Sequence, residues 1–170
     1  SGKKNYENCE QSLKSQIYEK SAGLADSEYR FHTLYESMIQ GVVYQSADGQ
    51  IILANPAAEK ILGVSADEMM QRTSETRDWQ AIDEKGHPMP GKNHPAMVAL
   101  RTGKAVINVT QGIYNPRKND YVWILTSAIP QFKKNTDKPF QVFATFLDIT
   151  DLKNATDALK KQKRDTQAIL

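Results

Sequence analysis

Residues 142–151 have the sequence V-F-A-T-F-L-D-I-T-D, in which a strand pattern gives way to a helix pattern. The first part, residues 142–147, is rich in β-branched and aromatic side chains, as is typical of a buried strand. From Asp151 to Leu170 the residues are mostly charged, polar and helix-favouring. A short polar hinge between a sheet and an outgoing helix can pass on a change inside a domain. The pattern therefore favours a relay over an enzyme.

The composition around this hinge indicates one ordinary globular domain with flanking sequence. The chain has 170 residues, of which 39% are hydrophobic and 25% are charged. The net charge is only +2, so no overall field attracts nucleic acid or an anionic membrane surface, and neither is an expected partner. The basic residues Lys160, Lys161, Lys163 and Arg164 cluster near the end, where we interpret them as one solvated helix face.

Cysteine use and hydropathy bear on the compartment. Cys9 is the only cysteine, so the chain can form neither an internal disulfide nor a cysteine-based metal cluster, which agrees with a reducing cytoplasm. No apolar run approaches the roughly 20 residues of a membrane span, so we expect no membrane contact from this segment. The opening Ser1-Gly2 and the helical pattern that stops at Leu170 are typical of an excised fragment. The full-length protein then has room for a membrane anchor or an effector domain elsewhere.

The N-terminal segment shows an apolar 4-3 spacing that predicts helices. Its positions are Tyr6, Glu10, Leu13, Ile17, Lys20, Leu24, Ser27, Phe31, Leu34 and Met38. Gly23 and the cap-like Asp26-Ser27 predict a break, with a helical linker over 1–26 and a second helix from residue 27 that docks on the domain. The same spacing fits a coiled coil, although Glu10 and Lys20 in its seam would weaken it.

The next elements are short. Residues 42–46 and 50–54 predict two strands joined by a hairpin turn at Asp48-Gly49, because glycine tolerates the positive φ of such turns. Asn55-Pro56 predicts a capped helix start, and Ser65 with Glu68 forms the capping-box pattern of another helix.

The second half of the chain predicts an antiparallel sheet. Residues 72–92 are rich in turn formers and should be irregular, and His94-Pro95 opens a helix that ends at Gly103. Three longer strands are predicted near residues 105–114, 121–131 and 140–149. Two strands, several short helices and three long strands predict an α+β domain.

Five segments in this order resemble the PAS domain family. They are G-V-V-Y-Q-S-A-D-G-Q-I at 41–51, A-N-P-A-A-E-K-I-L-G at 54–63, H-P-A-M-V-A-L-R-T-G at 94–103, Y-V-W-I-L-T-S-A-I-P at 121–130 and F-L-D-I-T-D at 146–151. The resemblance implies a PAS domain over 27–151, with a five-stranded antiparallel sheet, short helices covering one face and helices at both ends. It also implies a sensory role in a sensor histidine kinase, or in a diguanylate cyclase or phosphodiesterase. We expect a kinase fragment without catalysis of its own.

The pocket that this fold implies would lie between the sheet and the short helices. Strand alternation separates Ile124, Thr126 and Ala128 from Trp123 and Leu125, and the resemblance places the first set in the pocket. Both sets are largely apolar, so both faces of the sheet should be covered. The other expected lining residues are Val43, Gln45, Trp79, Met97, Val142, Ala144 and Phe146. Such a lining favours a small or apolar ligand, and the alternative is that these side chains fill the interior without one.

The hinge itself is the expected output connector. The resemblance makes Asp148 and Thr150 a signal relay, and we expect their side chains to hold the strand-to-helix corner by hydrogen bonds. The C-terminal signalling helix, 152–170, carries a 3-4 spacing that suits a parallel pair and a homodimer through the flanking helices. Its positions are Leu152, Ala155, Leu159, Gln162, Thr166 and Ile169. The alternative for this helix is that it packs on its own domain. The alternative for the function is a ligand-free dimerisation or interaction module of a diguanylate cyclase or phosphodiesterase.

Cofactor chemistry finds little support. Haem-binding PAS domains use a histidine within the long helix, whereas His94 lies at that helix's start, where a cap or turn role is expected. His32 and His87 have no paired metal-ligand spacing, so no metal is expected. The family's flavin adduct needs a cysteine near residues 58–71, and none is present, which argues against covalent flavin chemistry and leaves noncovalent flavin open. No hydrolase elbow, zinc motif or phosphate-binding loop occurs.

Overall fold

The computed structural model describes residues 2–169, with side chains from residue 7 on, and divides into two compact units. The first unit is the helix α1, Gly2–Ser37, and the second begins at Met38. The predicted break near Gly23 and the domain start at residue 27 were wrong, because α1 runs through both without interruption. A glycine in an exposed helix costs only about 1 kcal/mol relative to alanine. Asp26 also pairs with Arg30 within the helix at 3.0 Å, instead of capping a new one.

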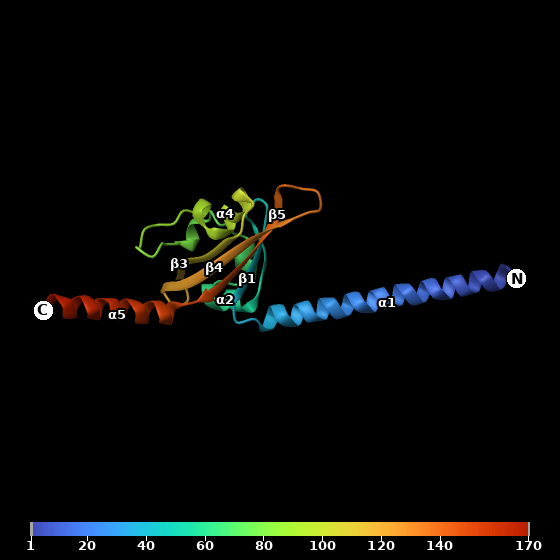
Figure 1. Ribbon diagram of the computed structural model, residues 1–170, viewed down its shortest axis with the longest axis horizontal. Helices are drawn as coiled ribbons and strands as arrows, with labels where there is room; N and C mark the ends of the chain where they lie inside the picture. The colour runs from blue at the N-terminus through green and yellow to red at the C-terminus, as the bar shows by residue number, and fades with distance from the viewer. Residues whose placement is uncertain (1, 170) are drawn as a thin grey trace. The chain divides into compact units, whose positions relative to one another are not determined.

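The second unit is built on a five-stranded antiparallel sheet in the order β2-β1-β5-β4-β3 (Figure 1). Its strands are β1 Gly41–Ser46, β2 Ile51–Ala54, β3 Val106–Asn115, β4 Asp120–Phe132 and β5 Pro139–Asp148. The predicted strands and the α+β architecture with a five-stranded antiparallel sheet are confirmed. The last strand, β5, lies at the centre because it pairs with both β1 and β4. The strand that ends at the output hinge is therefore held on both edges.

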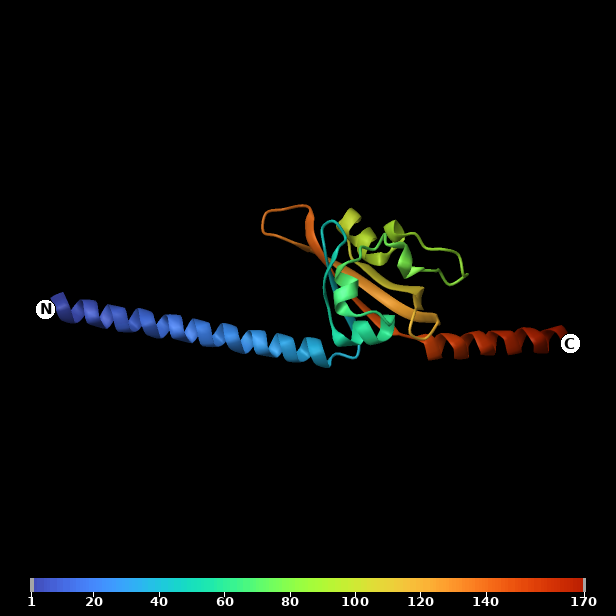
Figure 2. The same cartoon turned by 180° about the vertical axis from the view of Figure 1, so that it is seen from behind.

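Short helices cover one face of this sheet (Figures 1 and 2). They are α2 Pro56–Leu62, α3 Ala66–Met70, η1 Arg77–Trp79, η2 Gly91–Asn93 and α4 Pro95–Thr102. The two predicted caps are confirmed, since Ser65 and Glu68 form the capping box and Asn55 caps α2. Asn55 is fully buried, and its Oδ1 accepts from the N–H groups of Ala58 at 2.9 Å and Val42 at 2.8 Å. One side chain thus joins α2 to the start of β1.

Two groups of buried side chains lie between the helices and the sheet. The larger extends from α2 and α3 across the sheet and includes Met69, Val122 and Phe146. The smaller lies under α4 and consists of Ala96, Ala99, Ala128, Val142 and Ala144. Side chains this small let α4 approach the sheet closely.

The opposite face of the sheet is only partly covered in the unit from Met38 on. Trp123 and Leu125 are half-buried there, and Ile129 keeps 46% of its surface exposed. The expectation that both faces are covered is therefore not met by the described residues of this unit.

The output helix, α5, spans Thr150–Ile169 and begins two residues before the predicted start at 152. It follows β5 directly, and its side chains are largely exposed. Among residues 2–169, no helix is both long enough and apolar enough to span a bilayer.

Candidate functional site

A cavity lies between the inner face of the sheet and the covering helices. The space open to the centre of a water-sized sphere measures about 80 Å³. Its wall consists of Val43, Gln45, Ile51, Leu62, Ser74, Trp79, His94, Pro95, Ala96, Gln111, Ile113, Ile124, Thr126, Ala144 and Phe146. Most of these side chains are apolar, as in a typical small-molecule site.

The structure brings seven of the ten predicted lining residues to this wall, namely Val43, Gln45, Trp79, Ile124, Thr126, Ala144 and Phe146. The other three lie elsewhere. The sulfur of Met97 lies against Gly49 in the β1–β2 turn, because α4 directs that position away from the sheet. Ala128 and Val142 do face inward, but they pack under α4 and so line no space.

Several lining residues were missed by sequence reasoning, and three of them, Ser74, His94 and Gln111, are polar. Ser74 comes from the irregular segment, and its hydroxyl contacts the amide of Gln45, with the Gln45 Nε2 to Ser74 Oγ distance at 3.2 Å. Gln111 lies on β3, where its Nε2 donates to Thr126 Oγ1 at 3.4 Å. The only available signal was strand alternation on β3, which would have placed Gln111 and Ile113 on one face.

His94 lines the cavity, contrary to the cap role expected of it. It occupies the N-cap position of α4, but its side chain makes no capping hydrogen bond. Its ring is buried, with Nε2 at 3.2 Å from the carbonyl oxygen of Met89. Burial lowers the pKa of His94 below its usual 6.5, with the Met89 carbonyl acting weakly in the other direction. Burial therefore favours the neutral form of the ring.

A second cavity, of about 350 Å³, is lined almost entirely by the irregular segment, residues 72–93. Ser74, Trp79 and His94 line both cavities. Trp79 is held in place because its indole N–H donates to the carbonyl of Thr73 at 2.9 Å. Ile82 and Gly112 exchange backbone hydrogen bonds of 2.8 and 2.9 Å, which attach the segment to β3.

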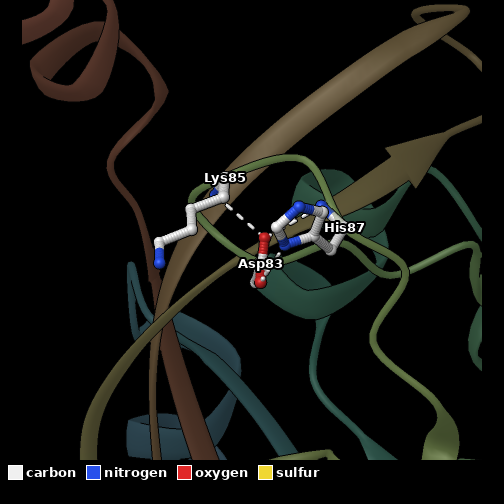
Figure 3. A network of polar contacts seen from close by, with 3 residues as sticks. All are labelled: Asp83, Lys85 and His87. Atoms are coloured by element: carbon white, nitrogen blue, oxygen red, sulfur yellow. Dashed lines mark hydrogen bonds and ion pairs between the residues drawn. The ribbon is translucent and has the colours of Figure 1, made fainter.

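The tip of this segment is an exposed turn arranged around one carboxylate (Figure 3). Asp83 Oδ1 accepts from the backbone N–H of Lys85 at 2.8 Å and of His87 at 2.9 Å, and Oδ2 lies 3.3 Å from His87 Nδ1. These contacts, with the His87 backbone N–H foremost, lower the pKa of Asp83. Because every contact is local, the cluster shapes the turn, and His87 stays outside the cavity.

At the output junction, Asp148 and Thr150 make the hydrogen bonds expected of them. Asp148 Oδ1 accepts from the Thr150 N–H at 2.9 Å and from its hydroxyl at 2.5 Å. The Thr150 hydroxyl oxygen in turn accepts from the backbone N–H of Trp123 at 3.0 Å. The Trp123 carbonyl accepts from the N–H of Ile149 at 2.8 Å. Both backbone polar groups of Trp123 are therefore bonded to the start of α5.

A further contact reinforces this corner one turn into α5. The ammonium group of Lys153 lies 4.8 Å from the ring centre of Trp123 and 2.6 Å from Asp157 Oδ2. Only 14% of the Lys153 side chain is exposed, so its stem covers the Trp123 ring. Among the described residues, no group of three or more His, Cys, Asp or Glu side chains is placed to hold a metal ion.

Solved structures with the same fold come from several kinds of protein. A domain of a sensory box sensor histidine kinase/response regulator from Geobacter sulfurreducens is 16% identical, with 74% of this chain and 96% of that chain covered and a TM-score of 0.54. A sensory box histidine kinase/response regulator from Burkholderia thailandensis E264 is 17% identical, with coverage of 82% and 98% and a TM-score of 0.53. The PAS domain of the fruit-fly ELK potassium channel is also 17% identical, with coverage of 71% and 95% and a TM-score of 0.54.

At these identities the likeness shows the fold, and the fold occurs with different effectors. No curated protein is a significant match to the chain. The sequence profile of the PAS domain family matches residues 39–151, which is most of the unit that carries the sheet, the cavity and the output junction. The chain therefore belongs to the PAS domain family, and its folded unit is a PAS sensory domain.

Proposed function

We propose that this PAS domain senses a small, largely apolar ligand in its cavity and relays the binding event to α5, as part of a sensor histidine kinase. One observation carries the proposal: the cavity and the output junction are served by adjacent residues of β4. Ile124 lines the cavity, and Trp123 bonds the start of α5 through both its backbone polar groups.

The relay follows from strand geometry. Neighbouring side chains of a strand point to opposite faces, so a ligand that displaces Ile124 turns the peptide joining it to Trp123. The carbonyl of that peptide accepts from Ile149, so its rotation changes a hydrogen bond of the junction. On the central strand β5, Phe146 lines the cavity and lies two residues before Asp148. This strand therefore also connects the cavity to the output junction.

The signal leaves along α5, whose apolar seam has room for a partner. Leu152 and Leu159 keep 66% and 60% of their surfaces exposed on the described helix. Apolar residues at a 3-4 spacing on an exposed helix suit a parallel coiled coil with a second copy of the chain. The proposed output is a change in the orientation or stability of this helix pair.

In this proposal the catalytic step belongs to the kinase and not to the PAS domain. The likeness to the structures of two sensory box histidine kinase/response regulators supports the choice of effector. A cytoplasmic location is part of the proposal, because Cys9 is an exposed free thiol and such thiols persist in reducing compartments. The native coding sequence after Leu170 tests the effector: a phosphoacceptor-histidine helix supports a kinase, whereas a cyclase or phosphodiesterase signature overturns it.

Sensing and relay are tested on the 170-residue chain in two steps. Mass spectrometry of the purified chain under native conditions, with a thermal-shift screen of metabolites, identifies a ligand. Hydrogen exchange with and without that ligand then follows the amides of Trp123 and of the first turns of α5. We expect the ligand to change their exchange in the parent and not in Asp148→Ala, while its affinity stays within about threefold. A ligand that leaves α5 unchanged refutes the relay, and failure to find any stabilising ligand refutes sensing.

Self-association through α5 has its own test, which also addresses a ligand-free dimerisation module. Leu159→Glu places a charge in the seam, and Asn154→Glu adds the same charge outside it. Sedimentation should show that Leu159→Glu weakens the dimer and that Asn154→Glu does not. Equal behaviour of the two variants would exclude the α5 seam as the contact. A stable dimer that responds to no metabolite would favour the dimerisation module.

A further inference from the structure

The wall of the cavity carries no permanent charge. Its fifteen residues include no Asp, Glu, Lys or Arg, and His94 is the only titratable side chain among them. Burial favours the neutral form of the His94 ring. An ion in this cavity would lose its hydration without gaining a partner of opposite charge, which is strongly unfavourable. The wall therefore selects against anions and cations alike.

One hydrogen-bond acceptor in the wall is left without a donor. The side chain of Gln111 is only 5% exposed, and its Oε1 is buried with no hydrogen-bond partner. Its amide nitrogen is directed to Thr126 Oγ1 on the neighbouring strand. Buried amide oxygens in native proteins are nearly always paired, so this atom indicates a donor that arrives with a ligand.

His94 adds a second acceptor. A carbonyl oxygen can only accept, so the His94 nitrogen that contacts the Met89 carbonyl, Nε2, must carry the proton. In a neutral ring Nδ1 then has a lone pair and can only accept. Other polar groups of the wall are engaged with protein partners: Gln45 with Ser74, and the Trp79 N–H with Thr73. Gln111 Oε1 and His94 Nδ1 are therefore acceptors that the protein leaves for a ligand.

We propose that the occupant of this cavity is an uncharged small molecule whose N–H or O–H group donates to Gln111 Oε1. This inference rests on the proposed sensing function and adds the chemical class of the ligand. One ordered water needs roughly 10–15 Å³ of such space, so the cavity of about 80 Å³ holds about six non-hydrogen atoms. The rest of the molecule packs against Ile113, Ile124 and Phe146, which favours a short apolar body.

Three probes of equal size separate the parts of this inference. 2-Pentanol carries a donor, 2-pentanone has the same skeleton with an acceptor only, and butyrate is an anion. Each is titrated into the isotope-labelled 170-residue chain, and the amide shifts of cavity residues report binding. We expect 2-pentanol to bind about fivefold to tenfold more tightly than 2-pentanone, as one hydrogen bond to a buried acceptor allows. Butyrate should bind most weakly.

A substitution then assigns the preference to one atom. Gln111→Leu removes the acceptor at similar size, and it should bring 2-pentanol to the affinity of 2-pentanone while leaving 2-pentanone unchanged. Gln141→Leu is the matched control, because Gln141 lies on β5 outside the cavity and pairs with Gln131. This control should preserve the preference for 2-pentanol.

The possible outcomes distinguish this inference from the function on which it rests. Equal binding of 2-pentanol and 2-pentanone by the parent chain overturns the donor, and tightest binding of butyrate overturns the neutral ligand. In both cases ligand binding in the cavity survives. If none of the probes shifts the cavity amides up to its solubility limit, both the ligand class and the sensing function are overturned. The comparison within the parent chain needs no variant to fold.

Discussion

Replacing Thr150 by valine removes the hydroxyl that joins β4, β5 and α5, while side-chain shape is almost unchanged. This hydroxyl donates to Asp148 Oδ1 at 2.5 Å and accepts from the Trp123 N–H at 3.0 Å. The first bond is exposed, and its loss costs about 0.5 kcal/mol. The second loss leaves a half-buried backbone N–H unpaired and costs about 1 kcal/mol more. Thr150→Val should therefore lower the free energy of unfolding by about 1.5 kcal/mol.

Two comparison variants isolate the hydroxyl. Thr150→Ser keeps it and should stay within about 0.5 kcal/mol of the parent. Thr166→Val removes a hydroxyl from the same helix, where it bonds only the carbonyl of Gln162 at 2.9 Å on an exposed surface. This variant should also change stability by no more than about 0.5 kcal/mol.

Urea unfolding of the 170-residue chain and its variants gives the free energies, and hydrogen exchange of the Trp123 amide gives the local effect. In Thr150→Val this amide should exchange about tenfold faster, because about 1.4 kcal/mol corresponds to a factor of ten. If Thr150→Val and Thr166→Val have the same stability and the Trp123 amide exchanges at the parental rate, the hydroxyl does not hold the junction. The relay would then have lost its structural basis.

The remaining predictions concern a buried cap, a pH dependence and the N-terminal helix. Asn55→Ala should lower the free energy of unfolding by about 3 kcal/mol in urea titrations, since two buried hydrogen bonds and one partly buried one are lost. The exposed cap variant Ser65→Ala should lower it by only about 1 kcal/mol. Because burial lowers the folded-state pKa of His94 below 6.5, the unfolded chain gains that proton first, so stability is lost as pH falls through about 6.5 towards the folded-state value. His94→Gln should reduce the difference in urea midpoint between about pH 7.5 and about pH 5.5, and an equal difference in both proteins would contradict this. Gly23→Ala should stabilise α1 by about 1 kcal/mol, seen as greater helicity on heating in circular dichroism, and lower helicity would contradict an unbroken α1.

Local signals predicted most of the elements. The Asp48-Gly49 turn, the Asn55 and Ser65 caps and the helix end at the left-handed Gly103 lie where the sequence places them, since each depends on neighbours within four residues. The predicted break at Gly23 was wrong because it rested on a local preference alone. Weak local preferences of about 1 kcal/mol shift a helix end but do not by themselves interrupt a long helix.

The cavity was predictable only in part. Strand alternation shows which side chains face the helices, but it does not show how closely each helix approaches them. Alternation correctly places Ile124, Thr126 and Ala128 on one face of β4. It cannot tell that α4 packs directly on Ala128 and leaves space beside Ile124, since this depends on how closely a helix from elsewhere in the chain approaches.

The sequence alone determined the order of elements, the strand faces and the polar hinge at residues 148–151, all of which follow from local pattern. Tertiary structure was needed to bring Ser74, His94 and Gln111 to one cavity, to leave Gln111 Oε1 without a partner and to bond Trp123 to Thr150, 27 residues away. The physical reason is that pairing of buried polar groups is a property of contacts between distant segments. Whether such a group finds a donor is settled only when the segments pack together.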